Sequence, residues 1–311
     1  MRLILPLLAA LASTPTAVSA ASPPVARAAT VAGPPVTAII SAFAPEMELL
    51  EGQLSERRES RIGGVRFVQG KLDGKPVLLF LSGMSMVNAA MTTQLALDHF
   101  AVRRIVFSGI AGGLDPALDV GDVVVPDAWA NYLESVFARA DRRGGYALPS
   151  DMEGRAPLEN WQMIFPRAAL VQTAEGGAIE AKLWFEVDPA LLAAARDAAA
   201  KVRLERCVET LCLAAQPRIL VGGKGVSASV FMDNAEYRAY LHRVFGAQAT
   251  DMESAAVAHV AHVQGTPFIA FRSLSDLAGA DPDHNQAGTF FRLASANAAT
   301  VVRAFMAELK D

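Results

Sequence analysis

The chain has 311 residues, of which 52% are hydrophobic and 19% are charged, and its formal net charge is −4. This composition supplies enough apolar side chains for a packed core and argues against a disordered protein. No cluster of Lys and Arg is interleaved with aromatic residues. The sequence therefore argues against a nucleic-acid-binding surface and favours a small-molecule ligand.

The N-terminal segment has the three parts of a signal peptide. Met1-Arg2 is a positive start, residues 3–12 are an apolar run, and Val18-Ser19-Ala20 is a small-residue cleavage site. The apolar run is shorter than the about 20 residues that a membrane-spanning helix needs. We therefore expect residues 1–20 to direct export to the periplasm or medium, without a membrane anchor after cleavage, and residues 21–35 to be an Ala/Pro-rich flexible leader. The alternative is an Ala-rich leader with no role in export.

The two cysteines, Cys207 and Cys212, are separated by four residues. In an oxidising compartment such a pair closes a small disulfide loop, whereas in a reducing cytosol both remain thiols. Because the leader indicates export, we predict the disulfide. Two cysteines without a matching pair of histidines argue against a zinc site. We expect no metal and no other cofactor.

Strand and helix patterns alternate along the first part of the chain. Residues 36–43 are almost continuously apolar, which is typical of a buried strand. The runs 65–70 and 76–81 flank Leu72-Asp73-Gly74 and predict a β-hairpin. Three further elements are predicted in chain order: a helix over residues 85–100 and strands over residues 104–108 and 120–125.

The second part begins with a stretch of weak periodicity. Residues 129–179 read as a long excursion from one domain rather than as a separate domain. Asp188-Pro189 has the form of a helix start, and this helix is expected to continue to Lys201. The remaining predicted elements are a strand over residues 218–221, a helix over 254–263, a strand over 268–272 and an amphipathic helix over 289–309.

This order of elements predicts the fold class. Strands that alternate with helices, with one hairpin, indicate a single three-layer α/β/α domain with a mixed central sheet over residues 36–311. Ligands of such sheets bind beyond the carboxyl ends of the strands. Glu46, the loop Ala111-Gly112-Gly113 and Asp276 all lie at predicted strand ends. This coincidence is the first indication of a site.

Three acidic residues have apolar neighbours: Glu46, Glu253 and Asp276. A carboxylate near an apolar interior has a raised pKa, which prepares it for proton transfer. The alternative is structural, because Asp251 or Glu253 could cap the amides of the helix that follows. Spacing alone leaves both interpretations open.

Three other motifs do not match known catalytic or binding patterns. The segment from Gly225 to Ser229 lacks the second glycine of a nucleophile elbow, which argues against a serine hydrolase. The glycines from Gly222 to Gly225 lack the spacing of a phosphate-binding loop. His259 and His262 could share one helix face, but no third ligand is nearby, which argues against a metal site.

Five motifs in order resemble the nucleoside phosphorylase superfamily, and specifically its branch of methylthioadenosine/S-adenosylhomocysteine (MTA/SAH) nucleosidases. The motifs are Ala42-Phe43-Ala44-Pro45-Glu46, Leu81-Ser82-Gly83-Met84, Ser108-Gly109-Ile110-Ala111-Gly112-Gly113 with Val120-Gly121-Asp122-Val123-Val124, Asp251-Met252-Glu253-Ser254-Ala255, and Arg272-Ser273-Leu274-Ser275-Asp276. Each motif is weak alone, but their order covers nearly everything from Val36 onward. The sequence is also similar to exported relatives and to plant vegetative and bark storage proteins.

The resemblance implies a reaction and roles. Family members cleave a purine–ribose bond through an oxocarbenium-like transition state, which needs a protonated leaving base and a nucleophile on the opposite face. By resemblance, Asp276 protonates or hydrogen-bonds N7 of the purine, Glu253 binds the ribose hydroxyls, and Glu46 activates water. The implied supporting contacts are Met252 against the sugar, Phe231 stacked on the base, the Met232 backbone at the base edge, Arg272 orienting the carboxylates, and the Ala111-Gly112 backbone lining the pocket.

The resemblance also implies a homodimer, for which we expect an apolar contact surface at Met86, Met91 and residues 129–132. The nucleophile is expected to be water, because Glu46 lies where phosphorylase relatives receive phosphate. Two departures stand against the family pattern: Ile110 where the nucleosidases usually have serine, and Ser85 where they have glycine. The main hypothesis is a hydrolytic purine nucleosidase. The alternatives are a non-catalytic binding or storage-like protein and a phosphate-dependent phosphorylase.

Overall fold

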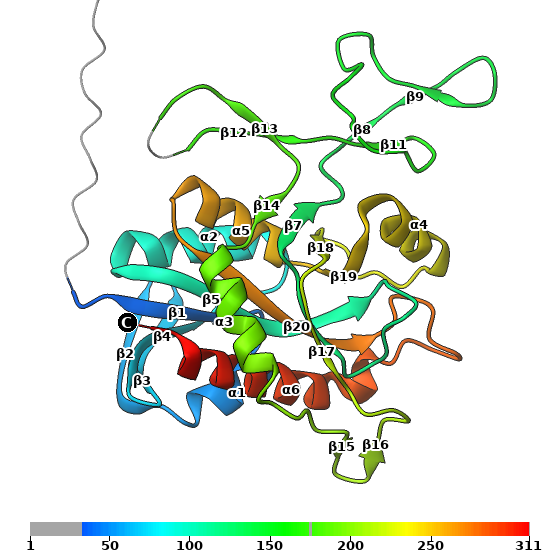
Figure 1. Ribbon diagram of the computed structural model, residues 1–311. Helices are drawn as coiled ribbons and strands as arrows, with labels where there is room; N and C mark the ends of the chain where they lie inside the picture. The colour runs from blue at the N-terminus through cyan, green and yellow to red at the C-terminus, as the bar shows by residue number, and fades with distance from the viewer. Residues whose placement is uncertain (1–32, 174–175, 311) are drawn as a thin grey trace, which may run out of the picture. The chain divides into compact units, whose positions relative to one another are not determined.

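A mixed sheet of 12 strands forms the centre of the computed structural model, which describes residues 33–173 and 176–310 (Figure 1). The signal-peptide prediction and most of the predicted leader lie outside the described residues. In spatial order the strands are β14 (Phe185–Glu186), β7 (Ala128–Asn131), β18 (Lys224–Ser227), β19 (Ala247–Asp251), β5 (Val102–Gly113), β1 (Val36–Ser41), β4 (Lys75–Leu81), β3 (Val65–Leu72) and β2 (Ser55–Ile62), with β20 (Phe268–Asp276), β6 (Val123–Val125) and β17 (Ile219–Val221) pairing off this path.

Helices pack on the sheet in two groups. One group comprises α1 (Ala44–Glu51), α3 (Pro189–Ala199) and α6 (Ala287–Glu308), which contact one another through α6, and α6 also packs on β5 and β20. The other comprises α2 (Met86–His99) and α5 (Ser254–Val263), which pack together, with α5 against β7 and β18 (Figure 1). The remaining helix, α4 (Ala235–Phe245), contacts β19. The predicted α/β class with a mixed sheet is confirmed.

Strand β5 organises the sheet because it pairs with three strands. Its first half is parallel to β1, its last two residues are antiparallel to β19, and β20 runs parallel along its other side. All six residues of β1 and all nine of β20 are buried. Burial on both faces explains why β1 and the first four residues of β20 are mostly apolar and do not alternate with polar residues.

Several local predictions are confirmed. Asp73 and Gly74 both have positive φ, 50° and 82°, as the two-residue turn of the β3–β4 hairpin requires. The Asp188 carboxylate accepts hydrogen bonds from the amides of Ala190 and Leu191 and so begins α3. Helix α5 has the predicted bounds.

Other elements differ from the predictions. The segment expected to form a glycine loop continues β5 as far as Gly113, because β20 and β19 supply hydrogen-bonding partners along it. Strand β2 was not predicted, because nearly all of its side chains are exposed and its sequence has no apolar pattern. Strands β18 and β19 and helix α4 were also missed: the two strands are short, at four and five residues, and α4 has a slightly polar average composition.

The excursion is made of small hairpins outside the main sheet. The excursion starts after β7. Trp129, which was predicted to belong to the excursion, therefore belongs to the sheet. Its strands pair only with one another: β8 (Ser135–Phe137) with β11 (Ile164–Pro166), β9 (Arg139–Ala140) with β10 (Tyr146–Ala147), and β12 (Ala169–Val171) with β13 (Glu180–Lys182). The chain then rejoins the sheet at β14.

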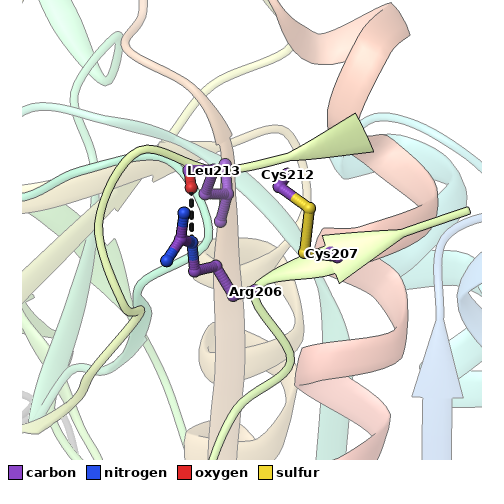
Figure 2. The surroundings of a disulfide bond; sticks show 4 residues. All are labelled: Arg206, Cys207, Cys212 and Leu213. Atoms are coloured by element: carbon purple, nitrogen blue, oxygen red, sulfur yellow. Dashed lines mark hydrogen bonds between the residues drawn. A yellow bond between two sulfur atoms is a disulfide. The ribbon is translucent and has the colours of Figure 1, made fainter. Parts of the chain in front are cut away.

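Cys207 and Cys212 form a disulfide in a small hairpin of β15 (Cys207–Val208) and β16 (Leu211–Cys212) (Figure 2). The two cysteines are directly paired across the hairpin. Next to them, Arg206 Nε donates a hydrogen bond of 2.7 Å to the carbonyl oxygen of Leu213. The covalent bond and the hydrogen bond together hold the segment between α3 and β17.

The predicted dimer surface is partly wrong. Trp129 and Tyr132 are 0% and 1% exposed and belong to the core, because the β7 segment is covered on both faces. Met91 is 57% exposed, and Met84 and Val87 beside it are 61% and 77% exposed. Met86, also expected on this surface, is partly buried and packs against the core, so the exposed apolar side chains in this region are those of Met84, Val87 and Met91. Within the described ranges no helix is long and apolar enough to cross a membrane.

Candidate active site

A cavity of about 210 Å³ lies where β1, β5, β19 and β20 end. Eight of the nine catalytic and binding residues predicted from the sequence line it, and Arg272 is the exception. The lining comes from five segments and two single residues: Ala42, Phe43 and Glu46; Ile110, Ala111 and Gly112; Val230, Phe231 and Met232; Thr250, Asp251, Met252 and Glu253; Ser275 and Asp276; with Met84 and Ala287.

Glu46 is held by backbone amides on both carboxylate oxygens. It is the third residue of α1 and is only 2% exposed. Oε2 accepts hydrogen bonds from the amides of Ala42 and Phe43 at 2.6 and 3.3 Å, and Oε1 accepts one of 2.9 Å from the amide of Ile110. Burial raises the pKa of Glu46, and the charge of Arg272 and these three amides oppose the rise. The result is a fixed carboxylate with a perturbed affinity for protons.

Glu253 also faces the cavity and does not cap the helix that it precedes. Its Oε1 accepts a hydrogen bond of 2.7 Å from the amide of Ser85, at the start of α2. Burial, with the neighbouring charge of Asp251, raises the pKa of Glu253 to about 7. Ser85 has φ 75° and ψ 158°, a conformation that glycine adopts readily. The glycine that the resemblance implies at this position would adopt this backbone geometry without strain.

The capping role belongs to Asp251. Its Oδ1 accepts hydrogen bonds from the amides of Glu253 and Ser254 at 3.2 and 3.1 Å. The Ser227 hydroxyl donates a further bond of 2.5 Å to the same oxygen. Spacing left open whether these two carboxylates cap the helix or serve the site. In the structure Asp251 caps α5, and Glu253 is free for a ligand.

Arg272 does not line the cavity and lies behind its wall, where it is placed to orient the carboxylates, the role that the resemblance implies. It is fully buried, with Nε 2.7 Å from Oδ2 of Asp251, and it also donates to the Ser254 hydroxyl. A Cβ at Gly109 would lie 1.7 Å from Nη1 of Arg272 and 2.7 Å from Oε1 of Glu46, so only glycine leaves space there. Arg272 therefore holds Asp251 directly and acts on Glu46 and Glu253 through its charge.

Asp276 is the last residue of β20 and is 4% exposed. Oδ1 accepts hydrogen bonds from the amide of Ala278 at 2.9 Å and from Nδ2 of Asn285 at 3.3 Å, and Oδ2 accepts one of 2.8 Å from the Ser275 hydroxyl. Burial raises the pKa of Asp276, with the Ala278 amide opposing. Asn285 was missed because it lies in a polar loop nine residues further on and carries no sequence signal.

The other predicted binding residues form the walls and the mouth. Phe231 is 62% exposed at the mouth, beside Val230, whereas Met232 is buried. A Cβ at Gly112 would lie 3.1 Å from Oδ1 of Asp276, so glycine keeps the cavity open next to this carboxylate. Ile110 presents an apolar side chain to the cavity, while its amide holds Glu46.

The two histidines singled out from the sequence have structural contacts. His259 stacks on Phe185 with ring centroids 4.5 Å apart, and Nε2 of His262 lies 2.6 Å from Oε1 of Glu180. No group of three or more potential metal ligands occurs among the residues that the structure describes. The polar groups that line the cavity include carboxylates, hydroxyls and backbone amides.

Comparison with known proteins shows the family of the chain. Residues 36–307 match the family model of the phosphorylase superfamily. The MTA/SAH nucleosidase of Mycobacterium tuberculosis is 31% identical over 249 residues, which cover 78% of this chain and 86% of the relative. That of Geobacillus thermodenitrificans is 32% identical over 244 residues, covering 78% and 84%.

A solved structure extends the likeness to three dimensions. The MTA/SAH nucleosidase of Neisseria meningitidis, in complex with methylthio-immucillin-A, superimposes with a TM-score of 0.66 at 27% identity and covers 88% of this chain and 99% of that one. The chain therefore belongs to the phosphorylase superfamily, on the branch of the MTA/SAH nucleosidases.

Proposed function

We propose that the protein hydrolyses the N-glycosidic bond of a purine nucleoside of the methylthioadenosine, S-adenosylhomocysteine or adenosine type and releases the free base and the sugar. The observation that carries this proposal is the convergence of Glu46, Glu253 and Asp276 on one cavity. Among the described residues, none of the three carboxylates has a recorded salt bridge. Glu46 accepts backbone amides at the start of α1, and the side chain of Glu253 does not cap α5.

The three carboxylates divide the reaction between them. Asp276, whose pKa is raised by burial, delivers a proton to N7 of the leaving base. Glu253 binds the ribose hydroxyls, and Met252 packs against the sugar. Glu46 orients and deprotonates the attacking water, with its carboxylate fixed by three amides. Proton delivery to the base and activation of water on the opposite face lower the barrier on both sides of the breaking bond.

Water is favoured over phosphate by the charge of the cavity. Its lining includes four acidic side chains and no Lys or Arg. Arg272 does not line the cavity and is paired with Asp251. A phosphate dianion needs charge-assisted donors, so this cavity repels it. Ile110 is the observation that favours the alternative, a non-catalytic nucleoside-binding protein, because it places an apolar side chain beside the water-activating carboxylate.

A nucleoside panel tests the proposal. The protein is incubated with methylthioadenosine, adenosine and inosine, with and without phosphate, and free base is measured. We expect base release from at least one nucleoside at a rate independent of phosphate. Release only with phosphate would instead identify a phosphorylase, and binding without release would identify a non-catalytic protein.

We further propose that the mature protein is an exported homodimer. Export is supported by the pattern of residues 1–20 and by the disulfide of Cys207 and Cys212. Association is supported by the exposed apolar side chains of Met84, Val87 and Met91 beside the cavity. Native mass spectrometry of protein recovered from outside the cytoplasm should give the mass of two chains that each begin at Ala21. Full-length chains would contradict export, and single chains at micromolar concentration would contradict the dimer.

A further inference from the structure

Three neighbouring strands place Asp276, Gly112 and Thr250 in one row. Asp276 of β20 is paired with Gly112 of β5, and Gly112 is paired with Thr250 of β19. Two strand spacings separate the outer residues, so their backbones are roughly 10 Å apart. All three line the same cavity, and the middle one has no side chain. The row is therefore a flat floor with a hydrogen-bonding side chain at each end.

The hydroxyl at the Thr250 end has no hydrogen bond of normal geometry. Thr250 is 4% exposed, and the one described side chain that interacts with its Oγ1 is Tyr132, without such a bond. Buried hydroxyls are nearly always hydrogen-bonded in folded proteins. Because Thr250 lines the cavity, a bound molecule is the partner that the site can supply.

A second hydroxyl lies behind the first. The Tyr132 hydroxyl is beside that of Thr250 and also lacks a hydrogen bond of normal geometry. A phenol is protonated at neutral pH and can serve as a donor, and burial of Tyr132 raises its pKa further. The Thr250 oxygen can then accept from Tyr132 and direct its own proton into the cavity. The pair forms a short donor chain that ends on an acceptor atom of the ligand.

We propose that Thr250 determines base specificity by donating a hydrogen bond to a pyrimidine-ring nitrogen of the purine, with Tyr132 as the donor behind it. A purine whose N7 is bound by Asp276 extends along the row toward Thr250 with the glycine floor beneath it. This inference rests on the proposed function, because the assignment of N7 to Asp276 sets the orientation of the base. The ligand class is a purine with an unsubstituted ring nitrogen at that end.

Direct binding of free bases tests the proposal without requiring turnover. Wild type, Thr250→Val and a matched control, Thr37→Val, are titrated by calorimetry with adenine and with 1-, 3- and 7-deazaadenine. Thr37 is also a buried strand threonine with an unpartnered hydroxyl, but it lies outside the cavity. Thr250→Val should bind adenine roughly tenfold more weakly than wild type, which is the loss of one hydrogen bond. Thr37→Val should bind as wild type does.

The deaza analogues identify the bond. In wild type, the 1-deaza or the 3-deaza base, whichever lacks the bonded nitrogen, should bind roughly tenfold more weakly than adenine. In Thr250→Val that difference should vanish, while the 7-deaza penalty, which reports on Asp276, should persist. Thr250→Ser keeps the hydroxyl and should retain the affinity for adenine, which separates loss of the bond from damage to the fold.

Three results would overturn the inference. The first is an adenine affinity that is unchanged in Thr250→Val. The second is a loss of affinity for each of the three deaza analogues that is the same in Thr250→Val as in wild type. The third is a wild-type protein that binds no purine. Failure of the proposed hydrolysis would look different, since base binding and its dependence on Thr250 would remain while no nucleoside was cleaved.

Discussion

Asp276→Asn is expected to lower the rate of base release by roughly 10²–10⁴ while leaving the fold intact. The asparagine oxygen can still accept the amide of Ala278, and its amino group can donate to the Ser275 oxygen after that hydroxyl rotates. What it cannot do is deliver a proton. Steady-state release of base from the best nucleoside of the panel measures the loss.

The pH profile provides an independent readout of the same residue. Asp276 must be protonated to act as the acid, so the wild-type rate should fall as pH rises through its pKa, which burial raises. In Asp276→Asn this alkaline limb should be absent. Asp281→Asn is the comparison variant, because Asp281 does not line the cavity but its charge adds to the raised pKa of Asp276. This variant should keep the alkaline limb and move it to lower pH. Near-native turnover in Asp276→Asn would remove Asp276 from the mechanism.

Glu46→Gln is expected to abolish hydrolysis and to leave nucleoside binding largely unchanged. The amide is almost isosteric with the carboxylate but cannot act as a base, so the defect should appear in turnover and not in affinity. Binding is expected to rest on Phe231, Met252, Glu253 and Asp276, which line the cavity and which the substitution leaves in place. Single-turnover rates and equilibrium binding of methylthioadenosine, measured on the same preparation, separate the two effects.

The exposed neighbour on the same helix supplies the control, since Glu48→Gln removes an equal charge outside the cavity. Loss of the Glu46 charge also removes repulsion of anions, so phosphate could support slow cleavage in Glu46→Gln. Full hydrolytic activity of Glu46→Gln, or a phosphate requirement in wild type, would be incompatible with the assigned role.

The sequence located most of the cavity because its residues follow buried strands. Glu46, Ala111 and Asp276 could be placed from apolar runs that end at one edge of a sheet, and the family resemblance added Phe231, Met232 and Met252. Arg272 was expected near the carboxylates, but its position behind the wall depends on Gly109, whose lack of a side chain makes room for the guanidinium. The spacing of residues along the sequence does not show that a glycine on one strand makes room for a side chain on the next.

Residues with long-range partners escaped prediction. Thr250 acquires its place from pairing with Gly112, which is 138 residues earlier in the chain, and Asn285 reaches Asp276 from a loop without periodicity. The choice between Asp251 and Glu253 as the helix cap was undecidable from spacing, because both precede the same first turn. It is settled by Ser85 and Ser227, whose backbone amide and hydroxyl each select one carboxylate.

The pairing of β5 with three strands has a consequence for motion. Gly112 is bonded within the ladder to the strands that carry Asp276 and Thr250, and the amide of Ile110 in the same strand holds Glu46. Distances among these groups can change only when the ladder itself opens, which is a rare event in the centre of a sheet. Phe231 and Met84 lie on connecting segments at the mouth and can move on the much faster timescale of loops. Entry of a ligand and alignment of the reacting groups are therefore kinetically separate properties of this fold.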